Sequence, residues 1–514
     1  MKNRTSENKP DKLFTSNTLS DVRPAGYAWF VEKFKLNVMP NWHISAISTS
    51  TIHKSTGSNG IITDIYPKSY LPEETAGGHL EFALKYDGVN LGYLSLIFNL
   101  EEQDDILGYI QQKPTGKYTR RIWFLFEFLT KIKLPISDIT QGNYIHLLEP
   151  DQYYAVTPGE RIQRCRIINN LAGNHKFCPI IRRSEKMKQM ESEDFQMQCQ
   201  NIITSYPSEL LRRALSYLYN KETKSSFKIE NISPDTSRAE RFMGLLALAE
   251  HQDFCEKNLL VDLQNRTVDT RFANKDYRTD LNYVGQTVSY QEQIVHYICP
   301  APEHLPDLME GLLHSHQTMK NGNVPAIVHA AAIAYGFVFF HPFDDGNGRI
   351  HRFLIHNILA VQGFVPKGLM FPVSAVMLKN PSLYDSSLEA YSRNLMKLVD
   401  YSLDDMGQIT VHNDVSCWYR YIDMTFQAES LYNFIKLTIE TELVHELEFL
   451  ASYDKIKKTV QEIIDMPDRL IDLFIRLCLQ NNGTLSGKKR AAHFDFLTER
   501  ELNLMEKAVR GESL

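Results

Sequence analysis

A twelve-residue loop between two apolar helical segments constrains the fold of this chain more than any other feature. It reads His341-Pro-Phe-Asp-Asp-Gly-Asn-Gly-Arg-Ile-His-Arg352. The preceding segment, 321–340, predicts a long buried helix, and the segment 349–362 predicts the next one. A glycine-bearing loop that opens directly into a helix is typical of an anion site, because the loop and helix N–H groups point toward one concavity.

Two side chains of this loop favour chemistry at phosphorus. His341 ends the first helix and is a candidate general base near neutral pH. Asp345 offers a hard oxygen ligand of the kind that Mg²⁺ prefers. We expect Phe343 to point inward and fix the loop against the core.

The second half of the loop is a candidate phosphate cradle. Gly346, Asn347 and Gly348 can form a backbone nest, because glycine tolerates the φ values that inward-pointing N–H groups require. Arg349 and Arg352 are three residues apart and share one helix face, where two guanidinium groups suit a polyphosphate. Taken alone, this half fits a surface turn with two solvated arginines equally well. A base and a carboxylate in the same loop favour the catalytic interpretation.

Composition limits the class of protein. A length of 514 residues favours two to four domains, and a net charge of −6 argues against a strongly basic nucleic-acid binder. The seven cysteines are scattered singly, which fits a reducing cytosol; Cys165, His175 and Cys178 are close enough in sequence for a metal site, although scattered core residues are the simpler interpretation. The longest apolar stretch is shorter than the ~18–20 residues of a membrane span. We therefore expect a soluble cytoplasmic protein without membrane contact.

The pattern along the chain predicts a mainly α fold in four parts. These are a disordered tail (1–20), an N-terminal α+β domain of unknown role (21–195), a helical catalytic domain (200–405) and a helical C-terminal domain (406–514). For the last part, a winged-helix-like module and plain helical packing fit equally well.

Local signals predict individual elements. They indicate a hairpin in 80–99 around Asp87-Gly88, helices at 120–132, 208–224 and 470–479, a Ser237/Glu240 capping box opening a helix at 238–252, a hairpin at 277–298, and a Thr498/Glu501 capping box before the last helix.

The loop matches the signature HxFx(D/E)GNGRxxR of the Fic (filamentation induced by cAMP) family at every fixed position. The helical region from about 205 to 400 also resembles the core of that family, whereas the first 195 residues and the last hundred lie outside it. The resemblance implies a helical Fic core with a β-hairpin flap. It also implies a protein adenylyltransferase, which moves AMP from ATP to a Ser, Thr or Tyr hydroxyl of a target protein.

The resemblance assigns roles to the loop residues. His341 would deprotonate the target hydroxyl, and Asp345 would hold Mg²⁺ at the α- and β-phosphates. The remaining residues would bind ATP, mainly at its phosphates: Gly346, Asn347, Gly348, Arg349, Ile350, His351 and Arg352. Asn380 and Tyr384 correspond more weakly to the adenine pocket, because Pro381 departs from the usual pattern there.

A second segment resembles the inhibitory element (S/T)xxxE(G/N) of the family. Ser226-Phe-Lys-Ile-Glu230-Asn231 carries all three constrained positions and precedes the active loop. The resemblance implies that Glu230 pairs with Arg352, displaces the γ-phosphate and holds the enzyme in an inhibited state. Thr236 with Glu240 is a rival match, but Arg241 follows where Gly or Asn is required.

The hairpin at 277–298 resembles the family's flap, on which a target protein would dock as an added strand. A surface hairpin without function is the alternative. A homo-oligomer is compatible with the sequence, as is a protein that acts alone.

Other functions remain open. Family relatives transfer phosphate, UMP or phosphocholine, and some remove AMP from a target with the same residues. A regulatory DNA-binding protein with the Fic core as a sensor is a different class, which the acidic net charge disfavours.

Overall fold

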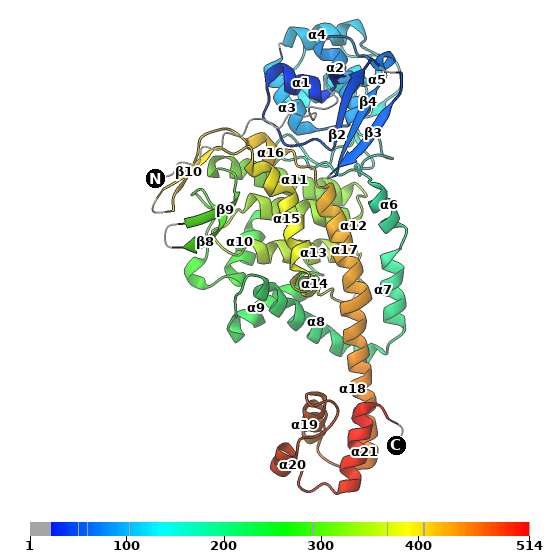
Figure 1. The fold of residues 1–514 in the computed structure, drawn as a ribbon, viewed down its shortest axis with the longest axis vertical. Coiled ribbons are helices and arrows are strands. Elements are labelled where there is room, and N and C mark those ends of the chain that lie inside the picture. The colour runs from blue at the N-terminus through cyan, green and yellow to red at the C-terminus, as the bar shows by residue number, and fades with distance from the viewer. Residues whose placement is uncertain are drawn as a thin grey trace. The chain divides into compact units, whose positions relative to one another are not determined.

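The computed structural model describes residues 22–49, 51–58, 60–101, 103–289, 292–366, 369–404 and 407–512, so the tail expected at 1–20 lies outside the described residues. The chain forms two compact units (Figure 1). The first takes in residues up to Glu193 together with Phe227–Phe364 and Met377–Asn433. The second takes in Asp194–Ser226, Val365–Val376 and Phe434–Leu514.

The first unit begins with the mixed α/β region that the sequence predicted. Its four-stranded sheet has the order β1-β2-β4-β3, in which only β2 and β4 are parallel, and a small sheet has the order β5-β7-β6. The strands are β1 (Val22–Ala25), β2 (His43–Ser48), β3 (Lys54–Ser58), β4 (Ile61–Tyr66), β5 (Ile145–His146), β6 (Glu160–Ile162) and β7 (Ile167–Asn169). The helices are α1 (Tyr27–Phe34), α2 (Ala76–Phe82), α3 (Leu91–Leu100), α4 (Gln103–Gln112), α5 (Lys117–Thr130) and α6 (Glu185–Glu191).

The hairpin predicted in 80–99 is wrong, because α2, a π-helical turn at Ala83–Asp87 and α3 occupy this segment. Gly88, at φ 82°, lets the chain leave the first helix, and the Asn90 side chain caps the next one by accepting from the Tyr93 N–H at 3.1 Å. The turn residues therefore separate two helices instead of two strands. Short apolar runs do not distinguish these alternatives by periodicity alone.

Three helices form the centre of the helical part of the first unit: α11 (Leu305–Asn321), α12 (Ala326–Phe340) and α13 (Asn347–Val361). α12 packs against both neighbours, and every side chain from Ile327 to Phe340 is buried. A helix that is apolar on all faces has to be central. It begins at Ala326 and not at 321, because Asn323, at φ 53°, and Pro325 break the helical run.

The chain between α6 and α18 contains further elements. They are α7 (Phe195–Thr204), α8 (Ser208–Ile229), α9 (Thr236–Leu248), α10 (Lys257–Thr267), β8 (Tyr283–Ser289), β9 (Glu292–Ile298), α14 (Val373–Lys379), α15 (Pro381–Met396), β10 (Tyr401–Leu403), β11 (Ile409–Val411), α16 (Ser416–Arg420) and α17 (Thr425–Leu437). The hairpin expected at 277–298 is confirmed as β8 and β9, which pair antiparallel (Figure 1). The predicted Ser237/Glu240 capping box is wrong, because Asp235 caps α9 and accepts from the Arg238 N–H at 2.8 Å.

The C-terminal part of the second unit contains α18 (Val444–Ile463), α19 (Asp468–Leu479), α20 (Gly487–His493) and α21 (Glu499–Arg510). These helices share a core that includes Phe474, Phe494 and Met505. The Thr498/Glu501 capping box is confirmed at the start of α21. No strand follows β11 within the described residues, so this part is plain helical packing without the strands of a wing.

No helix among the described residues is both long enough and apolar enough to cross a membrane.

Candidate active site

The predicted loop lies between the end of α12 and the start of α13. His341 ends α12 with φ 50°, and Gly346 precedes α13 with φ 89°, a left-handed value that glycine adopts without strain. Phe343 is completely buried, as expected. The Asn347 side chain braces the turn, because its Nδ2 donates to the Phe343 carbonyl at 2.7 Å and its Oδ1 accepts from the Phe343 N–H at 3.1 Å.

The histidine has a defined tautomer. His341 Nδ1 lies 3.0 Å from the Val338 carbonyl, which can only accept, so Nδ1 carries the proton and Nε2 has the lone pair. Burial lowers the pKa of His341 from its ordinary value of 6.5. A neutral imidazole with its lone pair on Nε2 is the form that a general base requires.

Glu230 occupies both arginines of the loop. Its Oε2 pairs with Arg349 Nε at 2.8 Å, and its Oε1 pairs with Arg352 Nη2 at 2.7 Å. Both guanidinium groups are almost fully buried, whereas the Glu230 side chain is 24% exposed. A Cβ at Gly348 would lie only 2.6 Å from Glu230 Oε1, so the absence of a side chain there allows the carboxylate to approach. The inhibitory pattern predicted the Arg352 pair but not the one with Arg349.

The end of α8 explains how Glu230 is held. Glu230 follows directly after α8, and Asn231 adopts φ 56°. Gly and Asn tolerate this left-handed conformation best, which gives a physical reason for Gly or Asn after the glutamate. Ser226, the other predicted residue of this element, lies in the last turn of α8.

Asp345 is suited to a metal but is already engaged. Its Oδ1 accepts from the Gly346 N–H at 2.6 Å and pairs with Arg349 Nη2 at 2.8 Å, while its side chain remains 42% exposed. A partly exposed carboxylate beside the Gly346-Asn347-Gly348 turn fits Mg²⁺, which usually keeps several waters.

The other predicted ATP-binding residues fall into two groups. Ile350 and His351 are completely buried, and His351 Nδ1 donates to the Ala334 carbonyl at 2.8 Å, so only their backbone can face a nucleotide. Tyr384 lies beside the arginines, because its hydroxyl accepts from Arg352 Nη1 at 3.4 Å. Asn380 stands at the N-cap of α15, one turn before Tyr384.

Two residues that hold the loop in place were not predicted from the sequence. The Arg278 side chain donates from Nε to the His341 carbonyl at 2.8 Å and from Nη2 to the Pro300 carbonyl at 2.7 Å, so it ties the base to the end of the β8–β9 hairpin. Gln264 Nε2 donates to the Asp345 carbonyl at 3.3 Å. Both act on carbonyl oxygens far away in the sequence, and no local pattern indicates such contacts.

The loop lies at the start of α13, in a helical part of the first unit. Residues 254–359 match the model described as the Fic/DOC family, so this part of the chain is similar to that family.

Two curated relatives are named "Protein adenylyltransferase Fic". The one from Drosophila mojavensis is 22% identical over 257 residues, covering 46% of this chain and 49% of that protein. The one from Nematostella vectensis is 35% identical over 91 residues, covering 17% and 20%. The chain thus spans about half the length of the first relative and a fifth of the second.

Two solved structures are also similar. A Fic family protein from Desulfovibrio desulfuricans G20 is 18% identical with a TM-score of 0.34, covering 64% of this chain and 85% of that one. A Fic domain containing signaling protein from Bacteroides thetaiotaomicron VPI-5482 is 15% identical with a TM-score of 0.37, covering 52% and 97%.

Proposed function

We propose that this chain is a protein adenylyltransferase that transfers AMP from ATP to a Ser, Thr or Tyr hydroxyl of a target protein. One observation carries the proposal: a neutral histidine, an exposed carboxylate, a glycine nest and two buried arginines converge on the start of α13. The names of the curated relatives favour AMP as the transferred group.

In the proposed reaction, the target hydroxyl loses its proton to His341 Nε2 and attacks the α-phosphorus of ATP, from which pyrophosphate leaves. Arg349 and Arg352 neutralise the phosphate charge, and the N–H groups of Gly346 to Gly348 orient the phosphate oxygens. Asp345 would hold Mg²⁺, which supplies further charge neutralisation at the phosphates when bound.

We propose that Glu230 inhibits this reaction. Its carboxylate occupies the guanidinium groups that the phosphates need, so ATP has to displace it or bind out of alignment. The Asp345–Arg349 pair adds a second internal partner to the same guanidinium. The chain in the described conformation should therefore transfer AMP slowly.

The flap is the proposed docking place for the target. β8 and β9 form a two-stranded sheet, and among the described residues no further strand pairs with its outer edges. An extended target segment can add to such an edge through backbone hydrogen bonds. Arg278 links the end of this hairpin, at Pro300, to the His341 carbonyl. This contact supports a docking position over the histidine.

The test is transfer from α-labelled ATP into a cell lysate by the Glu230→Gly variant, with mass spectrometry of the labelled band. We expect AMP on a hydroxyl side chain, and no label when His341→Ala is combined with Glu230→Gly. A mass corresponding to phosphate, UMP or phosphocholine would assign another transferred group. Loss of AMP from a labelled target would assign the reverse reaction.

A further inference from the structure

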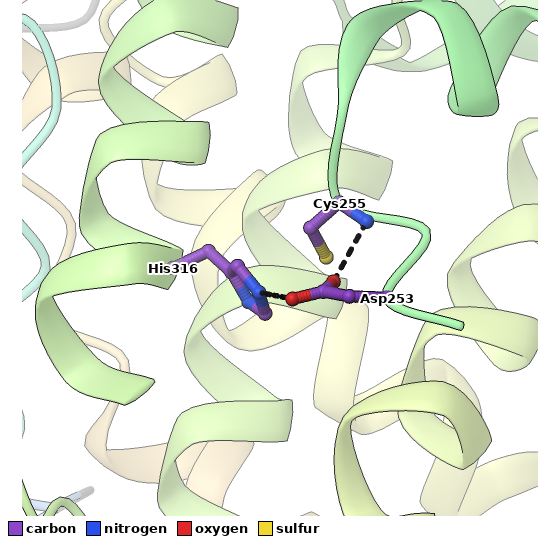
Figure 2. A group of neighbouring side chains, drawn as sticks. All are labelled: Asp253, Cys255 and His316. Carbon is purple, nitrogen blue, oxygen red and sulfur yellow. Dashed lines mark hydrogen bonds and ion pairs between the residues drawn. The ribbon is translucent and has the colours of Figure 1, made fainter. Parts of the chain in front are cut away.

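A second cluster of reactive side chains lies in the catalytic domain away from the loop. Asp253 and Cys255 belong to the segment between α9 and α10, and His316 belongs to α11. One potential ligand atom from each residue lies within 4.8 Å of the other two. Figure 2 shows the Cys255 sulfur and the His316 ring turned toward the Asp253 carboxylate. Cys255 and His316 are almost fully buried, whereas the Asp253 side chain is 18% exposed.

The internal contacts of the cluster leave one atom without a partner. His316 Nε2 lies 2.9 Å from Asp253 Oδ2, and the Cys255 backbone N–H donates to Asp253 Oδ1 at 3.0 Å. Among the residues that the structure describes, no hydrogen bond reaches the Cys255 thiol. A buried cysteine is often only a small apolar group, but this thiol faces a carboxylate and an imidazole.

An outer chain of hydrogen bonds orients His316. Its Nδ1 lies 3.0 Å from His329 Nε2, and His329 Nδ1 lies 2.7 Å from Gln362 Nε2. Histidines that bind metals almost always engage their other ring nitrogen in such a contact, which fixes the ring. A hydrogen bond that only stabilises the fold would need no more than the contact between His316 and Asp253. The outer chain through His329 therefore favours a metal ligand.

We propose that Asp253, Cys255 and His316 form a binding site for a divalent transition metal, with Zn²⁺ as the best fit. A sulfur, a nitrogen and a carboxylate oxygen suit zinc, which takes thiolate, imidazole and carboxylate ligands in tetrahedral geometry. Mg²⁺ and Ca²⁺ favour oxygen ligands alone. Three protein ligands leave the fourth position to water.

The proton balance of binding is simple. The Cys255 thiol loses its proton to solvent, and the His316 proton moves from Nε2 to Nδ1, so that Nε2 can bind the metal. His329 then accepts at Nε2 and donates from Nδ1 to the Gln362 side chain, whose oxygen turns toward it. The outer chain therefore accommodates both tautomers, because an imidazole and an amide can each reverse their donor and acceptor roles.

Lys320 opposes the metal. Its ammonium lies 2.7 Å from Asp253 Oδ2, where it already compensates the carboxylate and would repel a divalent cation. The site should therefore bind zinc more weakly than a Lys320→Met variant does. This gives a test that increases binding, which removal of a structural contact would not do.

The site is separate from the proposed active loop. Gln362 follows α13, whereas the loop precedes it, and a helix of 15 residues is about 22 Å long. Metal binding at this cluster is therefore independent of the proposed transfer reaction, and it is measured without any activity assay.

The experiment measures metal on the full chain, purified without a polyhistidine tag. After loading with Zn²⁺ and removal of the excess, we expect about one zinc per wild-type chain and a large loss in Cys255→Ser. Cys478→Ser is the matched control, because Cys478 is also buried but lies in α19. Equal zinc in wild type and Cys255→Ser would overturn the proposal, as would no zinc in wild type.

A second measurement does not depend on the folding of a cysteine variant. Co²⁺ bound in this site should give the charge-transfer absorption of a thiolate ligand in wild type. Lys320→Met should bind Zn²⁺ about ten-fold more tightly or better, since one nearby positive charge is gone. Absence of the absorption in wild type, or an affinity that Lys320→Met leaves unchanged, would refute the site.

Discussion

The Glu230 carboxylate neutralises charge on both arginines of the candidate site. It is a partly exposed carboxylate that bridges two almost fully buried guanidinium groups, and Asp345 also pairs with Arg349. Removing one partner of such a pair leaves buried charge uncompensated, unless another anion replaces it. ATP phosphates are that anion in the proposed reaction, so the arginines should bind them better without Glu230.

The first prediction concerns this glutamate. Glu230→Gly should raise the rate of AMP transfer by about ten-fold or more, because charge-assisted hydrogen bonds of roughly 1.5–3 kcal/mol no longer compete with phosphate. The measurement is self-modification with labelled ATP. Glu240→Ala removes the exposed glutamate of the rival pattern and serves as the matched control. If both variants behave like wild type, Glu230 is not inhibitory.

The second prediction concerns the base. His341→Ala in the Glu230→Gly background should lower the transfer rate by roughly 10²–10⁴-fold, the usual contribution of a general base. Binding of ATP should remain within a few-fold, because His341 holds no phosphate in the proposal. Unchanged transfer in the double variant would show that another group takes the proton.

The third prediction concerns pH. Burial lowers the pKa of His341, so the imidazole remains neutral and basic at pH values below its ordinary pKa of 6.5. The acidic limb of kcat/KM for Glu230→Gly should therefore lie below pH 6.5, and activity should fall only when the pH drops through the lowered pKa. A limb at or above pH 6.5 contradicts the role or the environment assigned to His341.

At the scale of the element, the end of α8 determines where Glu230 lies. Asn231 adopts φ 56°, which is costly for a β-branched residue. Asn231→Val should therefore displace Glu230 and raise AMP transfer, whereas Asn231→Gly should keep the inhibited state. The labelled-ATP assay compares the two variants. Equal activity in both would mean that the backbone at this position does not control the glutamate.

The conformation of the loop between α12 and α13 also depends on residues that hydrogen-bond to it. Asn347 closes the turn from within, and Arg278 and Gln264 hold it from other elements. The signature indicated that His341, Asp345 and the two arginines are neighbours, because they are close in sequence. It contained no information on Arg278 or Gln264, whose contacts depend on how the chain folds back.

Capping and turn signals predicted the structure correctly only where the same residues did not also fit another local structure. The Thr498/Glu501 box is formed as predicted, because both side chains and backbone groups lie within one turn. The Asp87-Gly88 signal failed, because the same residues that turn a hairpin also end a helix, and burial of the flanking apolar runs selected helices. α9 begins at Thr236, before the predicted start at 238, so its N-cap is Asp235 and not Ser237.

At the scale of the whole molecule, the second unit has a core of its own. Phe474 is completely buried in α19 and meets Phe494 edge to face, with ring centroids 5.5 Å apart. Phe474→Ala should destabilise this helical part by about 3–5 kcal/mol through the cavity that it leaves.

Hydrogen exchange by mass spectrometry checks this prediction. Peptides within 468–510 should exchange faster in Phe474→Ala, while Phe496→Ala, at a position 51% exposed, should change little. Equal protection in wild type and Phe474→Ala would mean that these helices do not rely on the shared core.

The sequence by itself predicted which side chains share the loop, the central position of α12 and the presence of a glutamate opposite an arginine. The first two features depend on residues that are near in sequence or on one apolar pattern, whereas the pair of Glu230 and Arg352, which are 122 residues apart, was implied by the family resemblance. Only the tertiary structure revealed that Glu230 also pairs with Arg349, that Arg278 holds His341, and that Asp253, Cys255 and His316 meet. The physical reason is that each of these contacts joins segments tens of residues apart, and packing of the helices sets their distances.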